Sequence, residues 1–241
     1  MTDRIFKPRG SGWHPPALCP EYRSTRLRAP AHKPLQHAPT QTELTGPVFG
    51  ADVIGRNDHD LIVNYAAGNE QALGPRIMVH GRLMDEEERG LPGKLVEIWQ
   101  ANAGGRYRHW NDGYLAPLDP NFGGCGRCLT DADGRYTFRT IQPGPYPWPN
   151  GGNDWRPAHI HFSVFGDGFV QRLVTQMYFE GDPHIALCPI VQAIPVPDAI
   201  DRLVARLDMQ TTVPMDIRAY RFDIVLRGCA QTPFENRREG F

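Results

Sequence analysis

The stretch Ala158-His-Ile-His-Phe-Ser-Val-Phe165 alternates apolar and polar side chains as far as Val164. A period of two is typical of a β-strand, because successive side chains point to opposite faces. Ala158, Ile160 and Phe162 would then face one side, and His159 and His161 would share the other. The stretch therefore predicts a strand that buries one face and presents two imidazoles on the opposite face.

Short runs with the same period lie on both sides of this stretch, separated by turn signals such as Asp133-Gly134. The chain has 241 residues, and its 25 glycines and 23 prolines make turns more frequent than in an average protein. The predicted fold is all-β, a β-sandwich of short, mostly antiparallel strands with long Gly/Pro-rich loops. The predicted strands are Arg76–Met84, Lys94–Gln100, Arg135–Ile141, Ala158–Phe165, Gln171–Glu180 and Arg218–Arg227.

Three other segments have patterns that do not fit strands. One short helix is expected near residues 198–208, because apolar side chains recur there at helical spacing after Asp198, a residue that can cap a helix. Those side chains are Ile200, Leu203, Val204 and Leu207. The segments Gly123–Gly126 and Pro143–Gly152 are so rich in glycine and proline that we expect loops.

The first 70 residues carry eight prolines that rule out long helices and central strands. Residues 1–70 are expected to form an irregular N-terminal arm, part of the same domain and engaged in contacts between subunits. Residues 71–241 would form the sandwich. A single domain of this size is long enough to bury a sizeable core.

Charge and composition exclude several classes of partner. The net charge is −1 and the basic residues are scattered along the chain, so the sequence predicts no basic patch that would bind nucleic acid or an anionic membrane. The N-terminus has no apolar signal segment, so a cytoplasmic protein is expected.

Five cysteines suit a reducing compartment. Cys125 and Cys128 have metal-ligand spacing, but they lack a second ligand pair and are interpreted as ordinary buried thiols.

The two histidines of the strand could hold a metal, although a hydrogen-bonded structural pair is an equally good interpretation. No carboxylate pair stands at a suggestive spacing nearby, and the tyrosines Tyr107 and Tyr146 lie on Gly/Pro-rich segments. A tyrosine has a pKa near 10, so it binds metal as a phenolate only beside a strongly polarising ion. Two phenolates with two imidazoles would favour ferric iron, whereas each tyrosine alone is more often a packing residue.

Several motifs resemble the intradiol ring-cleavage dioxygenase family, and within it the β chains of the protocatechuate-cleaving branch. The resemblance extends over nearly the whole chain, from Trp13 to Asn236. The motifs are Gly104-Gly-Arg-Tyr-Arg-His109, Pro143-Gly-Pro-Tyr-Pro-Trp148, Asp154-Trp-Arg-Pro-Ala-His-Ile-His161 and Tyr178-Phe-Glu-Gly-Asp-Pro183. The sandwich at 71–241 would accordingly be an intradiol dioxygenase catalytic domain.

This resemblance implies a site and a reaction. Tyr107, Tyr146, His159 and His161 would bind one non-haem Fe(III) per chain. Tyr146 would also act as a base. Arg156 would supply a fixed cation, and Gln176 would orient the site. The reaction would be cleavage of protocatechuate by O₂ to 3-carboxy-cis,cis-muconate, a step of aromatic catabolism in the β-ketoadipate pathway.

The resemblance also implies contacts outside the metal site. Tyr22 would contact the substrate carboxylate, and Trp148 would form a wall of the pocket. The partner would be a homologous α chain in a large hetero-oligomer. One departure is Pro149, which stands where family members often carry a cationic donor, so Arg23, Arg26 or Arg28 could compensate.

Three alternatives stay open at this point. The substrate could be another catechol, since Pro149 leaves the carboxylate contact without its usual donor. The chain could be a non-catalytic β-sandwich subunit that supports a partner. A zinc hydrolase using His159 and His161 is the third, and it lacks a third conventional ligand and a base.

Overall fold

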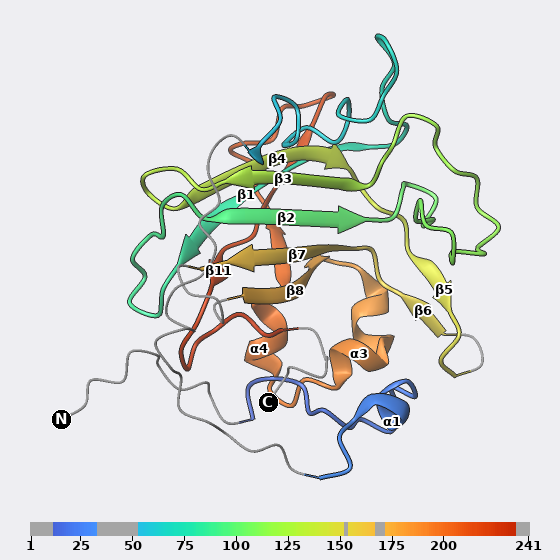
Figure 1. Ribbon diagram of the computed structural model, residues 1–241, viewed down its shortest axis with the longest axis vertical. Helices are drawn as coiled ribbons and strands as arrows, with labels where there is room; N and C mark the ends of the chain where they lie inside the picture. Colours follow the sequence, from blue (N-terminus) through green and yellow to red (C-terminus); the bar gives the residue numbers. More distant parts are fainter. Residues whose placement is uncertain (1–11, 33–52, 152–153, 167–171, 235–241) are drawn as a thin grey trace.

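The computed structural model describes residues 12–32, 53–151, 154–166 and 172–234. Its strands form one long hydrogen-bonded path and one small ribbon (Figure 1). The strands are β1 (Arg76–Met84), β2 (Leu95–Gln100), β3 (Cys125–Leu129), β4 (Arg135–Ile141), β5 (Tyr146–Trp148), β6 (Asp154–Arg156), β7 (His159–Phe165), β8 (Arg172–Phe179), β9 (Val204–Leu207), β10 (Arg218–Arg221) and β11 (Ile224–Val225).

The path runs β11-β1-β10-β9-β8-β7-β2-β3, and β4 pairs with β1 beside it. Neighbours are antiparallel except for the pairs β1–β10, β1–β11 and β8–β9, which are parallel. β5 and β6 pair only with each other and form the ribbon. The mostly antiparallel arrangement of short strands confirms the predicted all-β class.

The two halves of the path pack face to face, and β9 joins them. The Phe138 ring of β4 lies 5.7 Å from the Phe162 ring of β7, and Tyr136 lies 6.0 Å from the same ring. All three side chains are at most 2% exposed. Burial of such large aromatic side chains is a major contribution to core stability, and their contact across the two halves makes the fold a sandwich.

Short helices gather on one side of the strands, below β8 in Figure 1. They are α1 (Thr25–Arg28), the 3₁₀-helix η2 (Pro183–Leu187), α3 (Pro189–Gln192) and α4 (Pro197–Asp201). Apolar residues of α3, α4 and the segments beside them form a second cluster with Tyr178, and Trp13 and Tyr22 from the N-terminal segment pack on it. Among the described residues, no helix is both long and apolar enough to cross a membrane.

The helix expected over residues 198–208 is wrong in its second half. α4 ends at Asp201, and Val204–Leu207 is strand β9. The Tyr178 amide donates to the Leu203 carbonyl at 2.7 Å, and the Glu180 amide donates to the Ala205 carbonyl at 3.1 Å. Pairing with β8 on one side and β10 on the other outweighs the helical spacing of the apolar side chains.

Two of the expected loops also contain strand. β5 lies inside Pro143–Gly152, and its single proline, Pro147, is tolerated because the ribbon is only two strands wide and leaves edges unpaired. Gly123–Gly126 runs into β3, and a Cβ on Gly126 would lie 2.7 Å from the Asp58 carbonyl oxygen. Glycine is therefore needed there because another chain segment passes close by.

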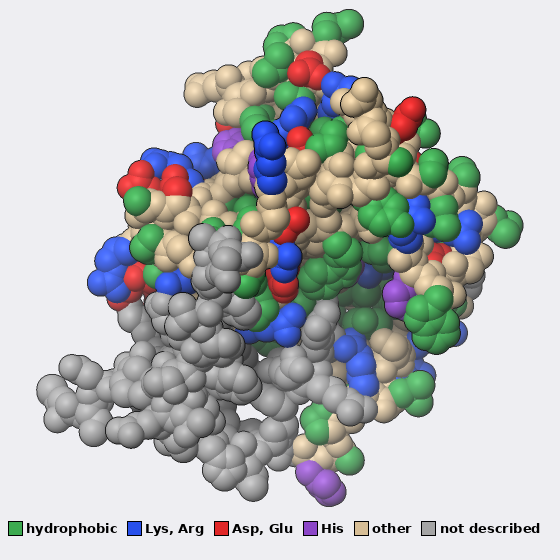
Figure 2. Space-filling view, turned by 45° about the horizontal axis from the view of Figure 1, so that its top comes forward, with side chains coloured by type: hydrophobic (Ala, Val, Ile, Leu, Met, Phe, Trp, Pro, Cys, Tyr) green, Lys and Arg blue, Asp and Glu red, His purple; other side chains and the backbone are tan. Residues whose placement is uncertain are grey.

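The predicted strand Arg218–Arg227 is two strands, β10 and β11. The interruption includes Asp223, whose carboxylate accepts a hydrogen bond from the Arg82 amide at 2.9 Å. The Arg82 amide of β1 therefore donates to a side chain here, and not to a backbone carbonyl of a paired strand. On the face drawn in Figure 2, acidic and basic side chains are interspersed across the surface.

Candidate metal centre

Strand β7 presents its histidines as the sequence predicts. Ile160 and Phe162 are fully buried in the core. The rings of His159 and His161 lie on the opposite face, with centroids 4.8 Å apart. His159 is itself 2% exposed, so both faces of the strand are covered at this position.

Two tyrosine hydroxyls meet these imidazoles. The Oη atom of Tyr107 lies 3.4 Å from Nε2 of His159 and 3.2 Å from Nε2 of His161. The Oη atom of Tyr146 lies 3.4 Å from Nε2 of His159. The structure therefore brings together all four residues that the sequence nominates as metal ligands. Their donor atoms, two oxygens and two nitrogens, converge on one point.

The loop that carries Tyr107 is fixed by hydrogen bonds to side chains. Oδ1 of Asn102 accepts from the amides of Gly104 (2.9 Å) and Arg106 (3.0 Å), and Oδ2 of Asp112 accepts from the amide of Tyr107 (2.8 Å). Gly105 has φ +82°, and a Cβ there would collide with the carbonyl oxygen of Pro145. Glycine at this position lets the two tyrosine-bearing loops approach closely.

Strand register places the neighbours of the two histidines. In β8, Gln176 pairs with His161 and Tyr178 pairs with His159. Paired residues of antiparallel strands point to the same face. From β2, Trp99 pairs with His161, and its ring stacks on the imidazole with centroids 4.7 Å apart and an interplanar angle of 4°.

Arg156 enters the site from the ribbon, where it pairs with Tyr146. Its Nη2 donates to Oε1 of Gln176 and, at 3.4 Å, to Oη of Tyr178. The Tyr178 hydroxyl donates to the same Gln176 oxygen at 2.8 Å. Arg156 is only 5% exposed, so this network holds its guanidinium inside the protein.

The charge states follow from burial and neighbours. Burial alone would lower the pKa of Arg156, but the nearby Tyr178 and Cys188 side chains raise it, and the net pKa lies above the ordinary arginine value. Burial, and then the charge of Arg156, holds the pKa of His159 well below its ordinary value. The site therefore combines a permanent cation with a neutral imidazole.

The orientation of that imidazole is also set. Nδ1 of His159 lies 2.6 Å from the carbonyl oxygen of Pro157. A carbonyl can only accept, so Nδ1 carries the proton and Nε2 keeps its lone pair. The lone pair faces the two tyrosine hydroxyls, which is the arrangement that a metal-binding histidine requires.

The residues predicted to contact substrate lie next to this cluster. Trp148 ends β5, and its ring makes an edge contact with Tyr22 at 5.3 Å between centroids. The guanidinium of Arg28 lies 4.7 Å from the centre of the Tyr22 ring, and that of Arg156 lies 5.8 Å from the centre of the Trp148 ring. The N-terminal segment thus reaches the edge of the site through a chain of aromatic contacts.

Tyr178 and Trp99 also contact the cluster, although neither is among the predicted site residues. Tyr178 stands two residues after Gln176 on the same predicted strand, so a period of two could have identified it. Trp99 has no such signal, because its place beside His161 depends on which strands are neighbours. The prediction for the cysteine pair is half wrong: Cys128 is buried, but Cys125 is exposed.

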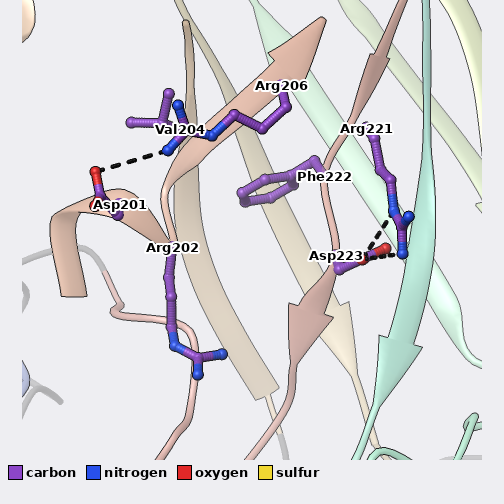
Figure 3. A pocket seen from close by; sticks show the side chains of 7 residues that line it. All are labelled: Asp201, Arg202, Val204, Arg206, Arg221, Phe222 and Asp223. Carbon is purple, nitrogen blue, oxygen red and sulfur yellow. Dashed lines mark hydrogen bonds and ion pairs between the residues drawn. The ribbon is translucent and has the colours of Figure 1, made fainter. Parts of the chain in front are cut away.

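Other candidate sites on the described residues are weaker. No group of three or more His, Cys, Asp or Glu side chains there could hold a metal. A cavity of about 410 Å³ lies between α4, β9 and β10, and none of its lining residues belongs to the cluster (Figure 3). Of its three arginines, Arg206 and Arg221 already pair with acids, the latter with Asp223 at 2.7 Å.

Two family models match the chain. The model described as "Dioxygenase" matches residues 44–228, and the model described as "Protocatechuate 3,4-dioxygenase beta subunit N terminal" matches residues 7–40. The protocatechuate 3,4-dioxygenase β chain of Burkholderia cepacia is 51% identical over 96% of this chain and 97% of its own length. The α chain of the Pseudomonas putida enzyme is 29% identical over 83% of this chain and 96% of its own.

A solved dioxygenase structure is also similar to this chain, at lower sequence identity. Catechol 1,2-dioxygenase from Acinetobacter sp. ADP1, inhibited by bound mercury, is 27% identical, with a TM-score of 0.51. The similarity covers 70% of this chain and 56% of that one.

Proposed function

Because this chain belongs to the intradiol ring-cleavage dioxygenase family, we propose that it uses one non-haem Fe(III) to cleave protocatechuate with O₂, yielding 3-carboxy-cis,cis-muconate. Family membership makes it a dioxygenase of aromatic catabolism. The observation that carries the proposal is the convergence of Tyr107, Tyr146, His159 and His161, with donor atoms 3.2–3.4 Å apart.

This donor set suits ferric iron. Two phenolate oxygens are hard anionic ligands, and a tyrosine with a pKa near 10 loses its proton only next to a strongly polarising ion. The described residues offer no carboxylate or thiolate cluster that would suit another metal. Tyr107, Tyr146, His159 and His161 would hold the iron, while Trp99 stacks on His161 and keeps its ring in place.

The protein groups around the iron have distinct tasks. Bound ferric iron would accept electron density from a chelated catechol and so make its ring reactive toward O₂. Tyr146 would accept a proton from a catechol hydroxyl. Arg156 would stabilise negative charge that develops on the ring, since its guanidinium stays protonated and is held by Gln176 and Tyr178.

Substrate choice would depend on the N-terminal segment. Tyr22 would contact the carboxylate of protocatechuate, and Trp148 would line the pocket beside it. Arg28 lies over the Tyr22 ring, which places a cation close to that contact and could replace the donor that Pro149 lacks. Pro149 is also the reason to retain another catechol as a second candidate substrate.

A partner chain completes the proposal. The relatives named above include both a β chain and an α chain, and this chain resembles both. We propose that it assembles with a homologous α chain in a hetero-oligomer inside the cytoplasm, with residues 1–70 contributing contacts between subunits.

The test is to purify the chain with iron, with and without a co-expressed α chain, and to measure O₂ uptake with protocatechuate and with catechol. Tyrosinate-to-Fe(III) charge transfer should colour the protein burgundy-red, and Tyr107→Phe should weaken that colour. Tyr220→Phe, a change at a tyrosine packed against Phe179 away from the cluster, is the matched control. An iron-loaded sample without colour would refute the proposed ligand set.

A further inference from the structure

The link between Arg156 and His159 consists of two residues, Pro157 and Ala158. It joins β6 to β7, so its conformation sets where the guanidinium and the imidazole stand relative to each other. The carbonyl of Pro157 already accepts from Nδ1 of His159. Proline has no N–H, so the amide of Ala158 is the only backbone donor in the link.

That amide is bound by a side chain from another element. The Ala158 N–H donates to Oδ2 of Asp182 at 2.9 Å, and Ala158 is only 6% exposed. Asp182 follows the turn after β8, where Gly181 has φ +83°. Oδ1 of the same carboxylate accepts from the backbone N of His184 at 2.9 Å and lies 2.8 Å from its Nδ1. Asp182 therefore has both oxygens engaged.

The end of β8 thus holds the link from two sides. Gln176 and Tyr178 bind the guanidinium of Arg156, and Asp182 binds the amide of Ala158. We propose that Asp182 is a positioning residue, which fixes the Pro157–Ala158 link and through it the orientation of His159 toward the tyrosine hydroxyls. This inference rests on the function proposed above and concerns a residue outside the predicted site.

Three variants separate this role from a general effect on folding. Asp182→Ala removes the acceptor of the Ala158 amide and both contacts to His184. Asp182→Leu keeps the branched shape of the side chain but offers no acceptor to the Ala158 amide. His184→Ala is the matched control, because it removes the ring that Asp182 contacts and leaves the bond to Ala158 intact.

Two readouts are independent of turnover. In metal-free protein, hydrogen exchange of the Ala158 amide should be at least about 10-fold faster in Asp182→Ala than in His184→Ala. In iron-loaded protein, the tyrosinate charge-transfer band should shift in both Asp182 variants and stay unchanged in His184→Ala. The kcat of the Asp182 variants should fall about 10-fold to 100-fold, with KM changed less than about 2-fold.

Equal exchange of the Ala158 amide and an unshifted band in Asp182→Leu would overturn the inference, as would the same band shift in His184→Ala. If Asp182→Ala does not fold, Asp182→Leu provides the same comparison. A wild-type protein without the charge-transfer band would count against the proposed function itself. A coloured wild type with unaffected Asp182 variants would count against Asp182 alone.

Discussion

The Tyr178 hydroxyl connects the two groups that orient the candidate site. It donates to Gln176 and accepts from Arg156, in a place with almost no exposure. A buried polar network of this kind is sensitive to the loss of one member, because the remaining groups are left without partners. The side chain is therefore a good place to test the electrostatic part of the proposed mechanism.

Tyr178→Phe should lower kcat by about 10-fold and leave the iron spectrum and KM nearly unchanged, because the hydroxyl supports Arg156 and does not touch the metal. Steady-state kinetics with O₂ uptake would measure this, and Tyr220→Phe serves as control. A variant with full kcat would show that Gln176 alone holds the guanidinium in place.

Tyr22→Phe should raise KM for protocatechuate at least about 10-fold, since a hydrogen bond to a charged group contributes about 1.5–3 kcal/mol and each 1.4 kcal/mol is about a factor of ten. The charge-transfer band should not move. KM for catechol is the internal control, because catechol has no carboxylate. An equal rise in KM for both substrates would mean that Tyr22 packs against Trp148 and does not bind the carboxylate.

The cysteines should differ in reactivity toward an alkylating reagent at about pH 8, because only the thiolate reacts. Burial raises the pKa of the Cys128 thiol to about 12. Cys128 should stay unmodified until the protein is unfolded, whereas the exposed Cys229 should react in the native state. Peptide mass spectrometry after a timed reaction would give both rates, and rapid native labelling of Cys128 would contradict the burial argument.

At the scale of elements, the sequence predicts β7 well and its surroundings only in part. A period of two is local, so it identifies which face of β7 carries His159 and His161. It does not say which strand lies beside β7, and that pairing is what brings Trp99 and Tyr178 to the histidines. The same limit explains β9, where pairing with β8 and β10, which lie outside the segment, decides between helix and strand.

Among the loops, the prediction concerns Gly105. Gly105→Ala should destabilise the Tyr107 loop and weaken iron retention, because alanine meets both an unfavourable positive φ and the Pro145 carbonyl. Gly93→Ala is the matched control: Gly93 has φ +66° with open space around it, so that variant carries the backbone strain alone.

The measurements for this pair are the iron content after dialysis and the midpoint of thermal unfolding. The Gly105 variant should lose more iron than the Gly93 variant at a similar change in midpoint. Equal iron retention in the two variants would indicate that the close approach of the loops is unimportant for the site.

At the scale of the whole molecule, the proposed iron links distant segments, because its four ligands come from β7, the ribbon and the loop after β2. Removing iron with a chelator should lower the midpoint of thermal unfolding, since a ligand that binds only the folded state stabilises it. For a domain of this size, each kcal/mol corresponds to about 2–4 °C. Calorimetry before and after iron is restored would test this, and Tyr107→Phe should respond less.

The parallel pairing of β1 with β10 also has a consequence for how the chain is made. Ile77 lies opposite Arg218, so the first long strand of the sandwich has to wait for one of the last segments to be synthesised. Contacts between residues so far apart in the sequence slow folding. Until the ribosome releases that segment, one edge of β1 can pair with β4 while the other edge stays unpaired, and an unpaired strand edge favours aggregation.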